Sequence, residues 1–526
     1  MRPPATEFND AAVARDAGTV TTWNLVSRLT GFARVVVVGG ALGATRLGDT
    51  YQAANQVSNV LFEFLVAGTL SAVLVPGLVT RLADGNRDRA EAFAGALLGR
   101  ALAVLGVIVA VGILAARPIM RVLLDGNDTS SRAAQVRLGA FLLLFVLPQL
   151  LLYAWGAVVT ATLHAEGRFA AAAAAPVANN AVVVVALGLF WAGGATGLDL
   201  GVSDRVLLGA GALGGVLAMT AIPAIAARRA GISLRPRWNI AEPLAASLRD
   251  IAWASSVVIP AQLFLLGSLV VAGRVAGGVV ACQIAFTLFL LPHALLGHPL
   301  ATVLYPRIAR GWTNGAFDDA RRDADRGMRL LLVLTAPAAA LLVALAPWLL
   351  RVIAIGALAR GAGASVVAAA LAGYGLGLTA YSWSLFVTRV SYATGDVRTP
   401  GLAALAGGVA GGVLLVVAAR SDGTALLYRI GLAHSVMVAT AAVATLVVLT
   451  RRRVLDVAWG RWITVAVAAS LAGVAARVWA DALGPGEGRM GAIAITAAGA
   501  IAGCVVYAAA LRAGGTRLVE LRADLS

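Results

Sequence analysis

Residues 93–116 read FAGALLGRALAVLGVIVAVGILAA, and this stretch indicates the class of fold. It is long enough to cross a bilayer as an α-helix, which takes roughly 20 mostly apolar residues. Arg100 is its one charged residue. The apolar residues do not alternate with polar ones as they do in a transmembrane β-strand. The stretch therefore predicts a membrane-spanning helix, whose backbone groups are all satisfied internally.

Runs of this kind recur along the whole chain. Hydrophobic residues make up 60% of the 526 residues and charged residues 13%, whereas a soluble domain carries roughly 25% charged residues. The mean hydropathy is +0.86. We therefore predict an all-α, polytopic membrane protein of about fourteen transmembrane helices. The expected helices lie near residues 23–43, 55–79, 93–116, 138–162, 169–193, 206–227, 248–273, 277–304, 328–350, 364–390, 399–419, 427–450, 462–480 and 489–511.

The distribution of arginine predicts the orientation in the membrane. The net charge is +16, but the basic residues, all arginines, lie mostly in short loops between apolar runs. This pattern sets topology and does not indicate a nucleic-acid partner. The densest loops, 228–249, 307–329 and 451–461, all follow even-numbered runs. The positive-inside rule makes that side and both termini cytoplasmic, so we expect a multi-pass protein of the inner (cytoplasmic) membrane.

Two short motifs indicate an internal repeat. Residues 73–76 (VLVP) are echoed by 303–306 (VLYP), and 164–168 (HAEGR) by 392–396 (YATGD) at nearly the same offset. Six helices per copy means that both copies insert the same way up, with a site expected between them.

The repeat predicts four parts of the chain. They are a cytoplasmic N-terminal segment (1–20), an N-lobe of six helices (21–230), a C-lobe of six helices (231–455), and two further helices with a short cytoplasmic tail (456–526). The N-terminal segment lacks a basic region followed by a cleavage site, so the first apolar run is expected to be retained.

Two arginines, Arg28 and Arg34, fall inside the first predicted helix. An arginine at mid-membrane raises the insertion free energy by about 2.5–3.5 kcal/mol, so such residues usually face a cavity or an anionic partner. The alternative is that the helix starts late and that Arg28 extends to the cytoplasmic headgroups. Arg274, between the seventh and eighth helices, and Arg389, in the tenth, are further basic candidates at or near membrane depth.

Two carboxylates are candidates for gating or coupling. Asp49 follows the first helix, where it is either a solvated surface group or gates a cavity and pairs with Arg46. Glu63 lies within the second predicted helix, where a carboxylate must be paired or protonated. Its candidate partners are Arg28, Arg34 or a coupling cation, and a purely structural ion pair remains an alternative. The sequence shows no catalytic triad, nucleotide-binding loop or metal-ligand cluster, so we expect neither an enzyme nor a cofactor.

Several of these segments resemble the MurJ/MviN family of the multidrug/oligosaccharidyl-lipid/polysaccharide exporter superfamily. The resemblance lies in residues 27–34 with Asp49, in 59–76, in 147–180 and in the 389–400 corner, and it covers the first twelve helices. It implies a V-shaped fold with a cationic cavity between two lobes. It also implies a flippase that moves lipid II from the inner to the outer leaflet by alternating access.

The resemblance further implies which residues carry function. Arg28, Arg34 and Asp49 stand where the family has functional charges, and Arg274 and Arg389 would contribute to binding the pyrophosphate. Where many members have an arginine pair in the second helix, this chain has Phe62 and Glu63.

Three functions follow as hypotheses. The first is a lipid II flippase, with membrane lipids and cell-wall synthesis proteins as expected partners. The second is a cation-coupled exporter of amphiphilic drugs or of another polyprenyl-linked oligosaccharide, with Glu63 and Asp49 as its coupling site. The third is a non-transporting scaffold for cell-wall enzymes.

Overall fold

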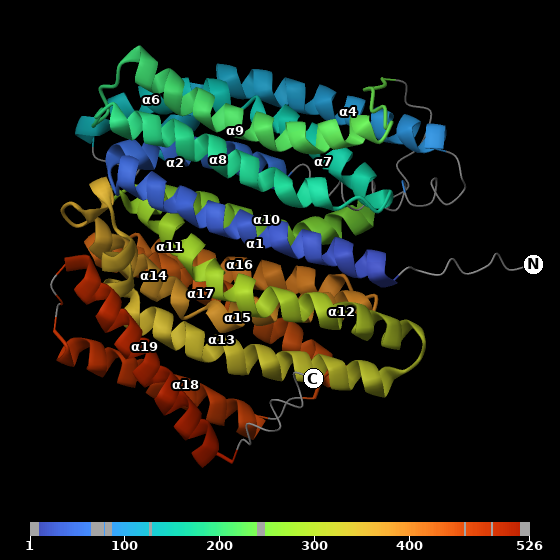
Figure 1. Ribbon diagram of the computed structural model, residues 1–526, viewed down its shortest axis with the longest axis vertical. Coiled ribbons are helices and arrows are strands. Elements are labelled where there is room, and N and C mark those ends of the chain that lie inside the picture. Colours follow the sequence, from blue (N-terminus) through green and yellow to red (C-terminus); the bar gives the residue numbers. More distant parts are fainter. Residues whose placement is uncertain are drawn as a thin grey trace, which may run out of the picture. The chain divides into compact units, whose positions relative to one another are not determined.

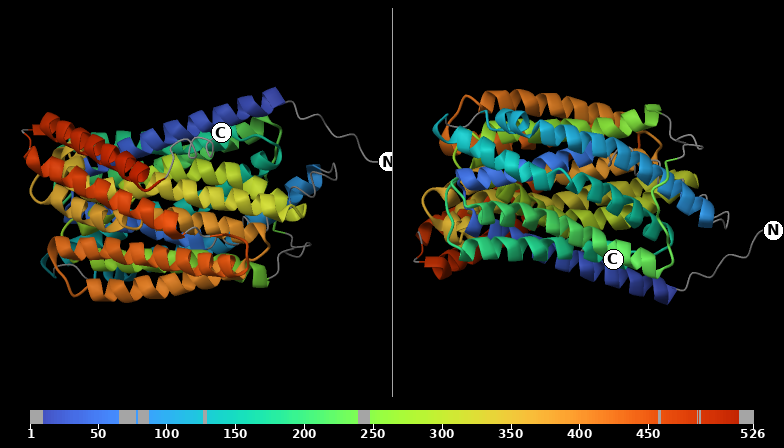
Figure 2. Two further views of the ribbon diagram at one scale, coloured as in Figure 1. Left: turned by 90° about the horizontal axis from the view of Figure 1, so that it is seen from below. Right: turned by 90° about the horizontal axis from the view of Figure 1, so that it is seen from above.

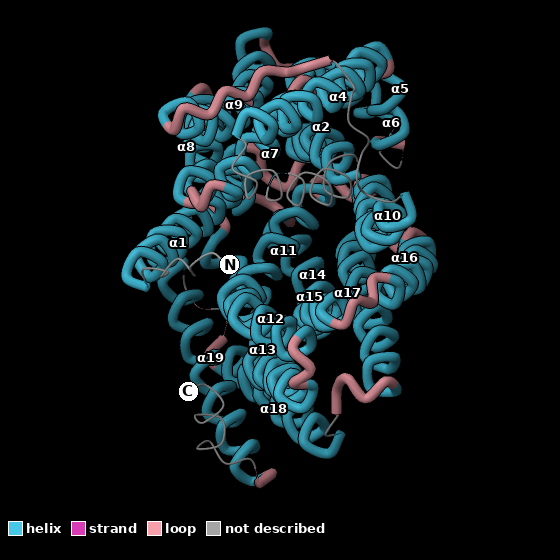
Figure 3. The backbone as a smooth tube through the Cα atoms, turned by 90° about the vertical axis from the view of Figure 1, so that its right-hand side faces the viewer, coloured by secondary structure: helices cyan, strands magenta, loops and turns pink. Residues whose placement is uncertain are grey.

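The computed structural model describes residues 10–64, 78, 87–125, 129–238, 248–456, 459–484, 486 and 488–515. These residues form helices and loops, with no strand among them (Figure 3). Their contacts divide the chain into two compact units. Unit 1 comprises Met1–Ala41, Ala53–Val122 and Ala133–Ile251, and unit 2 comprises Leu42–Gln52, Leu123–Arg132 and Ala252–Ser526. The lobe boundaries expected from the repeat stay a prediction.

Helices that lie wholly or mainly in unit 1 come first along the chain (Figure 1). They are α1 (Asp10–Ala41), α2 (Arg46–Phe62), α4 (Arg87–Leu114), α5 (Ala116–Leu123), α6 (Thr129–Val146), α7 (Gln149–Ala165), α8 (Ala170–Ala192) and α9 (Val202–Arg229). The division cuts through α2, whose first turns belong to unit 2.

The remaining helices belong to unit 2 apart from the first turn of α10. They are α10 (Leu248–Ala272), α11 (Gly278–Pro292), α12 (His298–Thr313), α13 (Phe317–Ile353), α14 (Gly363–Gly375), α15 (Leu378–Ala393), α16 (Arg398–Ala418), α17 (Gly423–Arg451), α18 (Trp459–Ala482) and α19 (Gly488–Ala513). A π-helical turn, His293–Gly297, joins α11 to α12, and a short 3-10 helix, Gly356–Ala359, precedes α14. Figure 2 shows these long helices side by side within the unit.

The helical, polytopic fold predicted from the sequence is confirmed. Eleven helices among the described residues are long and apolar enough to cross a membrane, and α14 with α15, bent by 46° at their junction, make up to twelve. The other two expected spans are the first and second. The first lies mainly within α1, which ends at Ala41, and the second begins in α2 and continues outside the described residues.

Apolar side chains on the outer helices indicate where lipid contacts the protein. On α16, Val409, Val413 and Val416 are 68%, 59% and 65% exposed. Their spacing places them on one face of the helix. A row of exposed valines is expected on a surface that faces lipid. Lipid tails are as apolar as valine, so no hydrophobic free energy is lost when these side chains stay exposed.

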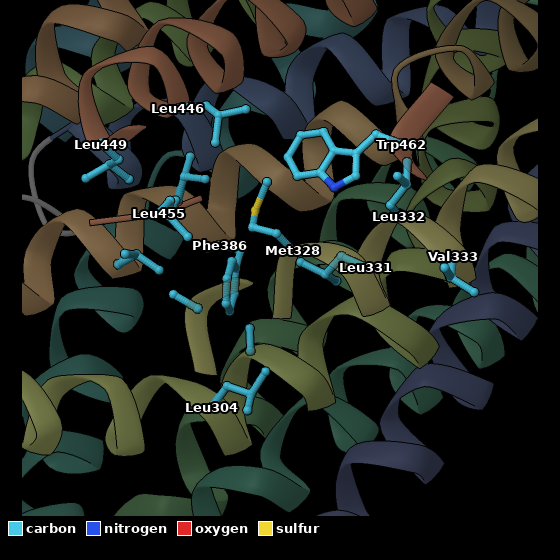
Figure 4. Close-up of a cluster of buried hydrophobic side chains, with 14 of the residues drawn as sticks. Leu304, Met328, Leu331, Leu332, Val333, Phe386, Leu446, Leu449, Leu455 and Trp462 are labelled. Atoms are coloured by element: carbon cyan, nitrogen blue, oxygen red, sulfur yellow. The ribbon is translucent and has the colours of Figure 1, made fainter. Parts of the chain in front are cut away.

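The core of unit 2 gathers around Phe386 of α15 (Figure 4). A Cβ atom on Gly327 of α13 would lie 2.3 Å from the Phe386 ring, so this close packing requires glycine. Trp462 of α18 belongs to the same cluster. Its ring centroid lies 4.6 Å from that of Trp383 of α15. The two C-terminal helices, α18 and α19, therefore pack on the rest of unit 2 through α13 and its neighbours.

The predicted repeat has a structural counterpart at two helix corners. After α7, the N–H of Arg168 donates to the Leu163 carbonyl over 2.8 Å around Gly167, whose φ is +75°. After α15, the N–H of Asp396 donates to the Ser391 carbonyl over 3.0 Å around Gly395, whose φ is +80°. Both corners close in the same way, with glycine in the left-handed conformation that ends many helices.

The second corner carries an additional carboxylate contact. Asp396 accepts hydrogen bonds from the N–H of Thr399 at 3.1 Å and from the N–H of Arg398 at 3.0 Å, and it pairs with Arg452. Burial alone would raise the pKa of Asp396, but the hydrogen bonds from Thr399 and the Arg452 guanidinium together hold this pKa below its ordinary value. The carboxylate therefore helps to hold the start of α16 to the end of α17.

Candidate functional site

Arg28 and Arg34 both lie on α1 and are half-buried in unit 1. Six residues of helix rise by about 9 Å, so the two guanidinium groups leave α1 at different heights. Among the described residues, neither arginine forms an ion pair with a carboxylate. Half-buried guanidinium groups without a counterion attract anions, and phosphate oxygens suit their planar geometry. The two arginines therefore form a candidate anion site.

Hydrogen bonds from α8 fix α1 at residues that lie close to these two arginines in the sequence. The side-chain amide of Asn180 donates to the Thr30 hydroxyl over 3.1 Å and to the Ser27 carbonyl over 3.3 Å. Asn180 is buried, and Thr30 also donates to the Val26 carbonyl within α1. Hydrogen bonds between helices fix their register in a membrane. This contact therefore positions the part of α1 that carries the candidate anion site.

Glu63 lies directly after α2 and is half-buried. Its neighbour Phe62 contacts Tyr153 of α7, with ring centroids 5.0 Å apart. Tyr153 is in turn within electrostatic range of Arg34. The end of α2 thus faces the same region of unit 1 as Arg34. Within the described residues, however, Glu63 forms no ion pair with Arg28 or Arg34, and its coupling role stays a prediction.

Asp49 lies in the first turn of α2 and is fully buried in unit 2. Its Oδ2 accepts the N–H of Gly277 at 2.7 Å, and its Oδ1 accepts those of Val279 at 2.9 Å and Val280 at 3.2 Å. These N–H groups belong to the start of α11, where the helix dipole also favours an anion. The interpretation of Asp49 as a solvated surface carboxylate is therefore wrong: the side chain caps a helix 228 residues away in sequence.

Further contacts tie the same two segments together. Arg46 donates to the Gly273 carbonyl, and its Nη1 lies 4.0 Å from the Asp49 carboxylate, at the outer limit of an ion pair. Gly277 has a φ of +78°, and a Cβ atom there would lie 2.1 Å from the Ala44 carbonyl. Only glycine fits this position. We call the contacts of Arg46 and Asp49 with the segment 273–280 the clasp.

The two other predicted basic residues lie in unit 2. Arg274 is exposed in the turn between α10 and α11, within the clasp segment, and donates to the Ala419 carbonyl at the end of α16. Arg389 is half-buried on α15, directly after Thr388, which lines a cavity. The structure therefore places Arg28, Arg34 and Glu63 in unit 1, and Asp49, Arg274 and Arg389 in unit 2.

That cavity is a feature that the sequence did not predict. It lies in unit 2, has a volume of about 360 Å³, and takes its walls from α10, α11, α14, α15, α16 and α17. His434 of α17 lies in its wall and is 7% exposed. A histidine within the apolar run 427–450 was the only signal in the sequence, and such a residue alone does not distinguish a cavity from packing.

Comparison with known proteins places this architecture in a family. Residues 38–485 match the family model described as "Lipid II flippase MurJ". The lipid II flippase MurJ of Burkholderia cenocepacia is 28% identical over 392 residues, which cover 73% of this chain and 73% of that protein. A probable lipid II flippase MurJ of Rhizobium tropici is 28% identical over 389 residues, covering 73% of this chain and 71% of the relative.

Solved structures share the fold. A lipid II flippase MurJ in an inward closed conformation superposes with a TM-score of 0.75 at 16% identity, covering 93% of this chain and 97% of that one. An inward-facing multidrug resistance MATE family transporter of the MOP superfamily gives 0.65 at 13% identity, covering 83% and 98%. Because the family model spans most of the sequence, the chain belongs to the lipid II flippase MurJ family.

Proposed function

We propose that this chain moves lipid II from the inner to the outer leaflet of the cytoplasmic membrane by alternating access. The observation that carries the proposal is the half-buried pair Arg28 and Arg34, which has no carboxylate partner among the described residues of a lipid II flippase family member. The protein is a transporter and not an enzyme.

The chemistry of the substrate suits this pair. Lipid II carries a pyrophosphate between its sugar head group and its polyprenyl tail, and guanidinium groups bind phosphate oxygens through paired, charge-assisted hydrogen bonds. Such contacts strengthen where water is scarce, because the local dielectric is low. Arg28 and Arg34 would hold the pyrophosphate while the tail stays in lipid. Arg274 and Arg389 are proposed to contact it at other stages of transport.

The clasp supports a gating role for Asp49. Both carboxylate oxygens already accept backbone N–H groups, so Asp49 has little capacity left to bind a coupling cation in this state. Opening the clasp would expose three N–H groups and a carboxylate that are otherwise buried. The clasp would therefore stay closed until substrate binding or conformational strain offsets that cost.

Coupling and orientation complete the proposal. Glu63 is half-buried and makes no ion pair with Arg28 or Arg34 among the described residues, so it is the candidate for binding a coupling cation or a proton. The arginine distribution supports an inner-membrane location with both termini in the cytoplasm. Cell-wall synthesis proteins are the expected protein partners.

The test is complementation of a bacterium whose own lipid II flippase can be depleted, with lipid II on the outer leaflet as the second readout. We expect the wild-type chain to restore growth and lipid II exposure. Arg28→Ala with Arg34→Ala should abolish both. A matched control, Arg117→Ala with Arg121→Ala at two exposed positions of α5, removes the same charge and should behave as wild type.

Failure of the inserted wild-type chain to restore lipid II exposure would overturn the proposed function. Restored exposure with the Arg28→Ala and Arg34→Ala chain would overturn only the role of the arginine pair. Drug resistance without lipid II exposure would instead favour the exporter hypothesis.

A further inference from the structure

We infer that the cavity in unit 2 is a binding site for a small, uncharged, largely apolar molecule that carries a hydroxyl group. All residues that line the site belong to unit 2, and Arg28 and Arg34 are not among them. Its volume of about 360 Å³ falls within the range of small-molecule pockets.

The walls of the cavity favour an aromatic or branched apolar ligand. Phe264, Phe286, Tyr374 and Tyr381 supply aromatic surface from four different helices. The polar side chains of the lining are uncharged and dispersed among apolar ones, as in a site that binds an apolar body and orients it through one or two hydrogen bonds.

His434 carries a buried ring nitrogen that forms no hydrogen bond with the described residues. The residue is 7% exposed, and the nitrogen is Nδ1. Five aromatic rings surround the imidazole, with centroid distances between 5.2 and 6.3 Å: Tyr374, Phe286, Phe289, Phe264 and Tyr381. Leaving one buried imidazole nitrogen without a hydrogen bond costs about 1–3 kcal/mol.

The lining of the cavity also favours an uncharged ligand. No arginine, aspartate or glutamate of the described residues lines the cavity, so a charged ligand or an imidazolium would be buried without a counterion. His434 is therefore neutral, with one nitrogen that donates and one that accepts. A hydroxyl group can satisfy either nitrogen, because it both donates and accepts.

The cavity also reaches the clasp. Val279 lines the cavity, and its N–H is one of the three that Asp49 accepts. An occupant would therefore touch the first turn of α11. Binding in this cavity does not depend on lipid II transport.

The test is photolabelling of the full chain in lipid nanodiscs with a dialkylphenol that carries a diazirine. Adducts are located by mass spectrometry of peptides, and saturation is measured by competition with the unlabelled phenol. We expect saturable adducts on residues that line the cavity. His434→Leu should weaken competition about fivefold, the effect of losing one neutral hydrogen bond.

Three further variants, a cavity-filling one and two controls, keep the test independent of how His434→Leu folds. Ser384→Phe fills the cavity from α15 and should abolish the saturable adducts, whereas Ser365→Phe, exposed on α14, should not. His298→Leu, at an exposed histidine of α12, is the control for His434→Leu. Adducts confined to lipid-facing residues would overturn the inference. Saturable labelling that Ser384→Phe leaves unchanged would overturn it as well.

Discussion

Replacing Asp49 by asparagine should loosen the clasp while preserving its shape. Asparagine has nearly the same volume, keeps one acceptor oxygen and replaces the other by an NH₂ group. If the retained oxygen takes the place of Oδ1, it still faces the N–H groups of Val279 and Val280. The NH₂ group then meets the N–H of Gly277, so a donor faces a donor where a 2.7 Å hydrogen bond stood.

The magnitude follows from the three contacts. Hydrogen bonds to a charged group contribute about 1.5–3 kcal/mol and neutral ones about 0.5–1.5 kcal/mol. Asp49→Asn loses one charged bond outright, whereas the weakening of the other two is largely offset because a neutral amide costs less to bury than a carboxylate. We therefore expect the local opening free energy of the clasp to fall by about 2–3 kcal/mol, which corresponds to roughly 30- to 150-fold in the opening equilibrium.

Hydrogen–deuterium exchange measures this opening directly. The amides of Gly277, Val279 and Val280 bond to Asp49, whereas the amides of Gly278 and Ala281 bond to backbone carbonyls. Exchange of the first group should accelerate by roughly 30- to 150-fold in the Asp49→Asn chain, because exchange follows the population of the open form. The second group serves as an internal reference.

Asp422→Asn is the matched control. Asp422 precedes α17 in unit 2, is exposed, and makes no side-chain hydrogen bond that caps the helix. Its replacement should change exchange less than twofold at the clasp. If Asp49→Asn behaves like Asp422→Asn, the carboxylate does not hold the clasp, and the gating role proposed for it fails.

Three further predictions concern other parts of the fold. Asn180→Ala removes the bonds to the Thr30 hydroxyl and the Ser27 carbonyl. It should lower the free energy of unfolding by about 1 kcal/mol, measured by detergent denaturation, since such bonds average about 0.6 kcal/mol each in membranes. Gly277→Ala should prevent recovery of folded, monodisperse protein. Gly167→Ala, where the space is open and only the positive φ costs about 1–3 kcal/mol, should still give folded protein. Because the pKa of Asp396 is lowered in the folded chain, its ionised carboxylate stabilises the fold fully above the ordinary carboxyl pKa. This stabilisation should be lost as pH falls through the lowered pKa. The thermal unfolding temperature of Asp396→Asn should lack this pH dependence.

Local patterns in the sequence predicted the helices well, and the echoed motifs 164–168 and 392–396 coincide with two corners that close in the same way. The corner at Gly167 and the corner at Gly395 each close through hydrogen bonds that span about six residues, so the glycine and its neighbours suffice to predict them. Apolar length likewise predicted most spans. It did not predict the bend between α14 and α15, because the run 364–390 is apolar throughout.

The site was harder to predict, because its contacts join distant segments. Nothing near Asp49 in sequence shows that its partners are the N–H groups of Gly277, Val279 and Val280. The interpretation of Asp49 as a solvated carboxylate after a helix was therefore open from the sequence. Backbone donors leave no side-chain signature, so even a search for a charged partner would have found only Arg46.

The cavity at His434 was missed for a related reason. Its walls come from six helices whose apolar residues resemble those of any buried helix. Whether such residues fill the space or leave it open depends on how the helices pack. The arginines of α1 were easier to identify, since a charge within an apolar run is conspicuous in the sequence alone.

The most direct test of the proposed transport measures lipid II translocation in proteoliposomes that contain the purified chain. Labelled lipid II would be detected when it reaches the opposite leaflet. We predict translocation by the wild-type chain and by the Arg117→Ala, Arg121→Ala control, and none above protein-free liposomes for Arg28→Ala with Arg34→Ala. Equal translocation by all three chains would contradict the role of the arginine pair, and no translocation by the wild-type chain would contradict the proposed function.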